Sequence, residues 1–344
     1  MKKILSAICG TLAAAFIFVG SACSTKVDSK IQIYMPDGAP ALAMAQLMAS
    51  ESDTESYHVV DSSTIQTYVT GENPKADLCI LPLNLASKLL GTGETYQMLG
   101  SVTHGNLYML STDTSVQYTA ENLDELIGKT VGVVQLQNVP GLTFKVILGQ
   151  NEIPWQEMGN DTQPAADKVN LKAVTPDAVS PATGLDCYVA PEPAASLKVS
   201  KTDLEFVGNL QQLYGGEKGY PQAVLVAKKS LIQTHEDWVK SFMTSMTNAA
   251  KWLETAEIKT IVSAVSSHLT DGLTPSLTEN NLSATAIEHS GIRFEKASDC
   301  KEEVNGFLEK MIKVNPESAK AVSDNFYYCL LYTSPSPRDR TRSR

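Results

Sequence analysis

The sequence contains little positive charge, and this deficit excludes several kinds of partner. Lys and Arg together number 28, against 38 Asp and Glu, which gives a formal net charge of −10 at pH 7. An acidic surface repels the phosphates of nucleic acid and the headgroups of anionic lipid. We therefore expect no nucleic-acid partner. The imbalance leaves open a buried site for a small molecule.

Cysteine is also scarce, with 6 residues in 344. Three of the six lie in the terminal segments described below. The other three, Cys79, Cys187 and Cys300, are too widely spaced for a disulfide framework, and no pair has the spacing of metal ligands. We expect Cys79 and Cys187 to be small buried strand residues, and we predict no metal site and no cofactor.

Signatures of catalysis are missing as well. The 5 histidines are scattered along the chain, at His58, His104, His235, His268 and His289. The sequence contains neither an HExxH pattern nor a GxSxG pattern. Because an enzyme needs convergent acid, base or metal-binding groups, we predict no catalytic residue and expect the protein not to be an enzyme.

The N-terminus is typical of an export signal. A charged start, MKK, precedes an apolar run over 4–19, and small residues lead to Cys23. This pattern resembles the bacterial lipoprotein signal, although that signal prefers Leu where this chain has Gly, three places before the cysteine. We predict a signal peptide over 1–22, lipidation of Cys23 and a polar tether over 23–30. The alternative is a plain secretory signal; a transmembrane anchor is disfavoured because the apolar run is short.

The C-terminal residues 329–344 resemble translated adaptor DNA rather than a natural protein sequence. The letters CLLYTSPSPRD back-translate to a string that resembles a transposase-based sequencing adaptor, and RTRSR fits read-through into index sequence. We expect an assembly artefact; the alternative is a basic, disordered tail that touches membrane lipid. When both terminal segments are left out, the range 23–328 contains 22 basic and 37 acidic side chains, which gives a net charge of −15.

The stretch KIQIYMPDGAPALAMAQLM, residues 30–48, predicts half of an α/β unit. Residues 31–34 read as a buried strand, 37–39 as a tight turn, and Pro40 as the first residue of an almost wholly apolar helix. A helix that is apolar on most faces must be buried. The turn offers unpaired N–H groups and small residues to a ligand; the alternative is an ordinary corner that binds nothing.

A repeated pattern predicts two similar lobes. Residues 77–82 (DLCILP) lead to an Ala-Ser pair, and residues 186–191 (DCYVAP) lead to another. Likewise, the turn at 37–40 is echoed by Asn-Val-Pro at 138–140. The length suits about two domains, and a hydrophobic content of 43% supplies ample core. Two α/β lobes are the economical interpretation; the alternative is chance similarity between common corners.

Four segments, taken in order, resemble bacterial solute-binding proteins of ABC importers, in the branch that includes nitrate, sulfonate, taurine and thiamine-pyrimidine binders. They are YMPDGAPALAMAQL, KADLCILPLNLASKL, GKTVGVVQ and DCYVAPEPAAS, and the resemblance covers about residues 31–314. It implies an α/β, two-lobe fold of the type II periplasmic-binding-protein kind with two hinge crossings. Lobe one would comprise 31–110 plus 221–328 and lobe two 111–220. The crossings would lie near 108–113 and 220–225.

Ligands of open α/β sheets bind beyond the carboxyl ends of the strands, where helices begin. Residues expected at those ends, in a cleft between the lobes, form the predicted ligand site: Met35, Asp37, Gly38, Ala39, Pro82, Asn84, Thr103, His104, Asn106, Gln135, Asn138, Glu192, Tyr220 and Gln222. This wall is rich in amides and aromatics, and no Arg or Lys can be placed in it. It therefore favours a neutral or cationic, heteroaromatic small molecule over nitrate or sulfonate.

The resemblance implies an extracytoplasmic solute-binding lipoprotein. It would be a monomer, anchored by lipid to the outer face of the cytoplasmic membrane, and would deliver a small organic molecule to an ABC importer permease. Two alternatives stay open: an enzyme of vitamin-precursor chemistry on the same fold, and a surface lipoprotein that binds another protein.

Overall fold

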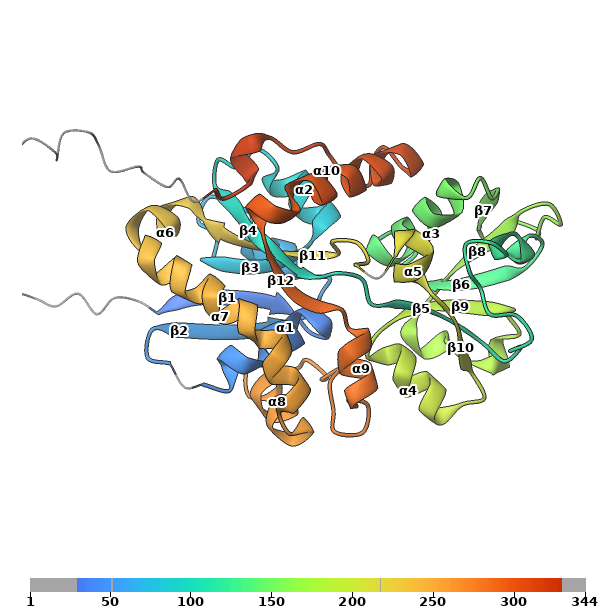
Figure 1. Ribbon diagram of the computed structural model, residues 1–344, viewed down its shortest axis with the longest axis horizontal. Helices are drawn as coiled ribbons and strands as arrows, with labels where there is room; N and C mark the ends of the chain where they lie inside the picture. The colour runs from blue at the N-terminus through green and yellow to red at the C-terminus, as the bar shows by residue number, and fades with distance from the viewer. Residues whose placement is uncertain (1–29, 51, 217, 330–344) are drawn as a thin grey trace, which may run out of the picture.

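The computed structural model describes residues 30–50, 52–216 and 218–329, which form two α/β lobes side by side (Figure 1). The first sheet has the order β12-β4-β11-β3-β1-β2 and the second β10-β5-β9-β6-β8-β7. We call the two sheets with their helices lobe one and lobe two. The two-lobe α/β fold predicted from the sequence is confirmed. The predicted lipidation site and signal peptide, and residues 330–344 of the C-terminal tail, lie outside the described residues.

Lobe one is built from both ends of the described chain. Its strands are β1 (Ile31–Pro36), β2 (Glu55–Val60), β3 (Leu78–Pro82), β4 (Tyr96–Thr103), β11 (Ala223–Lys228) and β12 (Ile292–Lys296). Its helices are α1 (Ala39–Met48), α2 (Leu83–Leu90), α6 (Lys229–Thr234), α7 (Glu236–Thr255), α8 (Ile258–Ser266), α9 (Ala284–His289) and α10 (Ala297–Val314). The chain leaves this lobe after β4 and returns at β11.

Lobe two comes from the middle of the chain. Its strands are β5 (Leu107–Ser111), β6 (Thr130–Val134), β7 (Trp155–Met158), β8 (Val169–Val174), β9 (Cys187–Pro191) and β10 (Glu205–Asn209). Its helices are α3 (Val139–Gln150), α4 (Ala194–Lys201) and α5 (Leu210–Gly215). Across the parts of the chain that the structure describes, no helix combines the length and the apolar character needed to cross a membrane.

The apolar helix α1 is buried as its composition requires. Ala41, Leu42, Ala43, Met44 and Ala45 have no exposed surface, because the helix contacts α7, α8 and the sheet on different sides. It begins at Ala39, one residue before the expected Pro40. Cys79 and Cys187 are buried in strands, as predicted.

The repeated Asp–strand–Pro–helix pattern has one structural meaning in both lobes. Asp77 Oδ2 accepts the backbone N–H of Gln32 at 2.9 Å, and Asp186 Oδ2 accepts that of Thr130 at 2.7 Å. In each lobe, the aspartate preceding one strand thus ties down the start of the neighbouring parallel strand. The similarity of the two segments reflects equivalent positions in two similar sheets.

The expected division at 110/111 falls inside a strand of lobe two. Strand β5 pairs with β9 and β10, so the chain passes between the sheets at 104–106. It returns over 218–222, because β11 already belongs to the first sheet from Ala223. The apolar letters of β4 and β5 read as strand on both sides of the crossing, and they do not indicate which sheet each strand joins.

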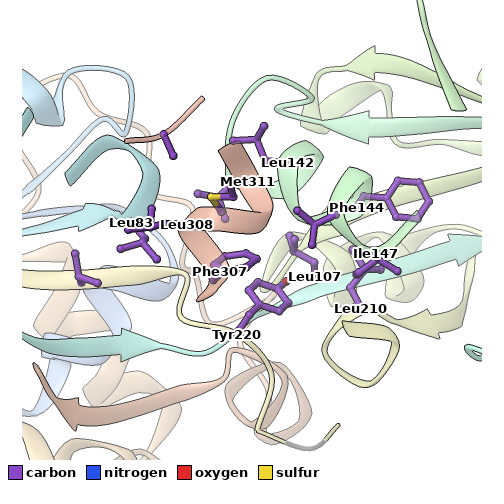
Figure 2. Close-up of a cluster of buried hydrophobic side chains, with 14 of the residues drawn as sticks. Leu83, Leu107, Leu142, Phe144, Ile147, Leu210, Tyr220, Phe307, Leu308 and Met311 are labelled. Carbon is purple, nitrogen blue, oxygen red and sulfur yellow. The ribbon is translucent and has the colours of Figure 1, made fainter. Parts of the chain in front are cut away.

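One side of the boundary between the lobes is a shared apolar core. Figure 2 shows Phe307, Leu308 and Met311 of α10 between Leu83 of α2 and side chains of lobe two. The Phe307 ring lies 5.1 Å from that of Tyr220 and 5.3 Å from that of Tyr214. Because this cluster is continuous through both lobes, the lobes are packed together on this side.

Candidate functional site

The carboxyl ends of the parallel strands in both sheets meet at the boundary. In lobe one, Thr103 and Pro82 both pair with Ala223. In lobe two, Leu107 at the start of β5 pairs with Pro191 at the end of β9. Since His104 to Asn106 joins β4 to β5 directly, α2 and α4 both begin near the crossing. This is the edge at which open α/β sheets place their ligands.

A polar network joins the two crossings to lobe two. Gln222 Nε2 donates to Asn106 Oδ1 at 2.8 Å, and Asn106 Nδ2 donates to the Glu192 backbone oxygen at 3.2 Å. The Glu192 N–H donates in return to the Asn106 carbonyl at 2.9 Å. Three residues predicted for the site are therefore brought together, from three separate segments of the chain.

Glu192 is a fully buried carboxylate at the start of α4. Its Oε2 accepts the backbone N–H of Ser196 at 3.0 Å, and its Oε1 accepts the Ser196 hydroxyl at 2.7 Å. The N-terminal end of a helix favours negative charge, so the position suits an ionised side chain. His289 Nδ1, from α9 of lobe one, lies 3.2 Å from the same Oε1 and crosses the boundary to reach it.

The His289 ring lies between two aromatic side chains of lobe two. It stacks on Tyr108 with ring centroids 4.5 Å apart and an angle of 22°. The Phe206 ring meets it edge-on, 5.4 Å away at 89°. Burial raises the pKa of Tyr108 above its ordinary value of 10.0, so the phenol stays neutral. Both arrangements are favoured geometries for aromatic pairs.

His104 lies at the first crossing and is 2% exposed. Its backbone N–H donates to Gly291 O at 2.8 Å. Burial, with a contribution from Arg293, lowers the pKa of His104 to about 3, so the imidazole is neutral near pH 7. Its Nε2 lies 3.1 Å from Glu295 Oε2, but neither ring nitrogen makes a contact with hydrogen-bond geometry.

Two further buried polar atoms at the crossing also lack a partner. They are Gln211 Nε2 and Gln222 Oε1. The other end of the Gln211 amide is used, because its Oε1 accepts the Leu107 N–H at 3.0 Å and the Tyr220 hydroxyl at 3.2 Å. Buried polar atoms are almost always paired in folded proteins, so a concentration of unpaired ones at one place requires an explanation.

Other predicted residues lie outside this network. Met35 is buried in the core of lobe one, Ala39 is 3% exposed at the start of α1, and Tyr220 belongs to the apolar cluster shared by the lobes. The Asp37 carboxylate receives the backbone N–H groups of Gly38 and Ser276. Asn84 donates to Ser318 O at 3.3 Å. These polar side chains hold lobe one together.

Gln135 and Asn138 are exposed where β6 leads into α3, with Gln135 at φ 54. Beneath this loop lies a cation that the sequence did not place. Lys145 is buried, donates to Leu136 O at 3.3 Å and pairs with Glu157 at 2.6 Å. Its charge is therefore already balanced, and its role is to support the loop.

Four residues at the boundary were not predicted to be site residues: Tyr108, Phe206, Gln211 and His289. Tyr108 and Phe206 lie in strands whose letters indicate only burial. His289 comes from a short helix about a hundred residues beyond β9, and no local signal indicates that it faces Glu192. The alternation of side chains along a strand could have placed Tyr108 and Leu110 on one face, but not their partners.

Two cavities lie away from the boundary. One of about 750 Å³ is lined by lobe-one residues that include Lys30, Glu55 and His268. One of about 250 Å³ is lined by lobe-two residues that include Lys129 and Asp186. None of the predicted site residues lines either one. Within the described ranges, no three His, Cys, Asp or Glu side chains are grouped to hold a metal ion.

The sequence matches no protein-family model and no curated protein. Solved structures share its fold. An ABC transporter protein from Parabacteroides distasonis has a TM-score of 0.69 at 18% identity, covering 88% of this chain and 100% of its own. The periplasmic aliphatic sulphonate-binding protein of Escherichia coli has a TM-score of 0.58 at 12% identity, covering 88% and 93%.

A third similar structure is the ligand-binding component of an ABC-type import system from Staphylococcus aureus, solved with zinc bound. Its TM-score is 0.55 at 13% identity, and the match covers 90% of this chain and 99% of that one. At these identities, the likeness concerns the fold: two α/β lobes joined by crossings of the chain.

Proposed function

We propose that this protein is an extracytoplasmic solute-binding protein, which holds a small organic molecule between its lobes and delivers it to an ABC importer. The observation that carries the proposal is the set of unpaired buried polar atoms on His104, Gln211 and Gln222. The fold, shared with binding components of importers, supports the same function. The proposed function is non-covalent binding and involves no chemical change of the solute.

The unpaired polar atoms of His104, Gln211 and Gln222 favour a bound solute at the crossing. Leaving a buried donor or acceptor unsatisfied costs about 1–3 kcal/mol, and three side chains near the crossing carry such atoms. A solute with donors and acceptors of its own would offset it, as would an ordered water. His104, Asn106, Glu192 and Gln222 are then the groups that contact the solute. The loops around Asp37–Ala39 and Gln135–Asn138 would form the rim.

The two sides of the boundary have different roles in this proposal. The side with α10 and α3 is apolar and stays packed. On the other side, His289 of α9 contacts Glu192, Tyr108 and Phe206 of lobe two, and a contact made by one side chain can break and re-form. Gly105 and Gly219 lie in the two crossings at φ 84 and φ 68, a backbone conformation that glycine adopts readily. Closure around a solute would use these crossings as hinges.

The membrane attachment is a separate part of the proposal. Lipidation at Cys23 would hold the protein at the outer face of the cytoplasmic membrane, near its permease, as a monomer. The test is metabolic labelling with a tagged fatty acid in cells that express the whole sequence. Cys23→Ser should abolish the label, and labelling that persists in this variant would remove the anchor from the proposal.

The solute-binding function is tested by thermal shift on the purified protein. The panel covers thiamine precursors, flavins, amino-substituted heterocycles, sulfonates and nitrate. A solute present at 100 times its Kd stabilises the folded state by about 2.7 kcal/mol, which gives a clear rise in Tm. A true hit should lose its effect in Gln222→Ala and keep it in Asp113→Asn, a change beside the distant cavity of lobe two. A hit that behaves in the opposite way would move the site to that cavity.

A further inference from the structure

Tyr108, Phe206 and Glu192 form a three-sided pocket that belongs entirely to lobe two. Tyr108 lies in β5, Phe206 in β10, and Glu192 directly before α4. The strands β5 and β10 are paired, with Tyr108 opposite Asn209 and Leu110 opposite Phe206. The Tyr108 and Phe206 rings are 5.3 Å apart at 73°. Ser196 fixes the carboxylate. The pocket therefore exists independently of lobe one.

The occupant of this pocket comes from the other lobe. The His289 ring lies flat on Tyr108, meets Phe206 edge-on and presents Nδ1 to Glu192 Oε1 at 3.2 Å. Stacking, an edge contact and a hydrogen bond to a carboxylate are the three contacts that would recognise any flat ring bearing an N–H. His289 itself is 27% exposed, whereas Glu192 is completely buried, so the histidine side chain is in contact with solvent and the carboxylate is not.

We propose that His289 is a built-in stand-in for the solute. It fills the Tyr108–Phe206–Glu192 pocket in this structure and must withdraw when the solute enters. The solute is then a planar nitrogen heterocycle that carries a ring N–H or an amino group. This inference rests on the proposed solute-binding function and names the chemical class that the same site takes.

Competition follows from this geometry. A solute that occupies the pocket has to displace the α9 side chain, so removing that side chain should increase affinity for flat nitrogen rings. Sulfonate and nitrate gain nothing from the pocket, because the Glu192 carboxylate would repel an anion. The pocket therefore also gives a physical reason for selectivity between solutes.

Chemical rescue with free imidazole tests the inference. In purified His289→Ala, imidazole should bind with a Kd on the order of millimolar, as expected for five heavy atoms, and should raise Tm in a saturable way. Wild type and His235→Ala should show no such saturable rise, because their pocket is filled. Tetrahydrofuran, a saturated and uncharged ring of the same size without an N–H, should not replace imidazole. The double variant His289→Ala/Glu192→Gln should lose at least tenfold in imidazole affinity.

The contrary result is equally defined. If imidazole shifts His289→Ala no more than wild type, the pocket does not recognise flat nitrogen rings and the inference fails. In that event, solutes found with wild-type protein in the thermal-shift panel remain valid. If His289→Ala folds poorly by circular dichroism, His289→Ser replaces it, with the same expected binding. Conversely, rescue by imidazole with no solute in the panel would count against the transport function, while it would still show that the pocket accepts a flat nitrogen ring.

Discussion

Phe307→Ala is the substitution that most directly tests whether the apolar cluster holds the lobes together. Phe307 has no exposed surface, lies on α10 of lobe one, and contacts Tyr214 of α5 in lobe two and Tyr220 of the second crossing. Figure 2 shows its contact with Tyr220. Truncating a buried Phe to Ala costs about 3–5 kcal/mol. Two aromatic contacts are lost together, so we expect the upper half of that range.

The expected loss has a particular form. If the cluster makes the two lobes one cooperative unit, wild type should unfold in a single transition in urea. Phe307→Ala should unfold in two, because the contact that couples the lobes has been weakened. A lower apparent m-value would accompany this change, since each step exposes less surface.

Tryptophan fluorescence can follow the lobes separately. Trp155 lies in β7 of lobe two, whereas Trp238 and Trp252 lie in α7 of lobe one. Replacing both α7 tryptophans with Phe leaves Trp155 as a reporter of lobe two alone. The matched control is Phe242→Ala, a buried lobe-one residue that stacks on Trp238, which should destabilise lobe one without changing the coupling. A loss below about 1 kcal/mol in Phe307→Ala, or coincident transitions in that variant, would refute the reasoning.

Three further predictions concern the strand anchors, the site and pH. Asp186→Ala should cost about 0.5–1.5 kcal/mol in urea unfolding, because the Thr130 N–H exchanges its carboxylate acceptor for water; an unchanged midpoint would contradict this. Asn106→Ala and Glu192→Ala should both lower affinity for a solute in titration calorimetry while the circular dichroism spectrum is kept. If neither changes affinity, the boundary is not the site. Folding lowers the pKa of His104 from 6.5 to about 3. The free energy of unfolding should therefore not depend on this group above pH 6.5, and should fall by up to roughly 5 kcal/mol as the pH drops toward about 3. His104→Gln should flatten that dependence.

The sequence was sufficient for the fold because its signals were local. A strand followed by an apolar helix needs burial on several sides, and α1 obtains it. The Asp–strand–Pro–helix pattern predicted two similar lobes, and the paired roles of Asp77 and Asp186 explain why it recurs. Where a strand changes sheets is not a local property, so the division near residue 110 fell within β5.

The site was predictable only in part, for the same reason. Asn106, Glu192 and Gln222 follow from the rule that ligands gather at strand ends, and the structure brings them together. Asn84 follows the same rule, yet its amide is bonded to Ser318, 234 positions away. The meeting of His289 with Tyr108 depends on the packing of a helix from one lobe against a strand of the other, which no periodicity in the sequence records.

The one-sided apolar boundary makes this molecule suitable as an optical sensor. Dyes at Glu288 and Ser200, which are exposed on α9 of lobe one and α4 of lobe two, would report on the side of the boundary where His289 contacts Glu192. A second pair at Glu309 and Gln150, exposed on α10 and α3, would report on the side of the boundary that holds the shared apolar core. Energy transfer should change with solute in the first pair and stay constant in the second. The ratio of the two signals would then report the solute concentration.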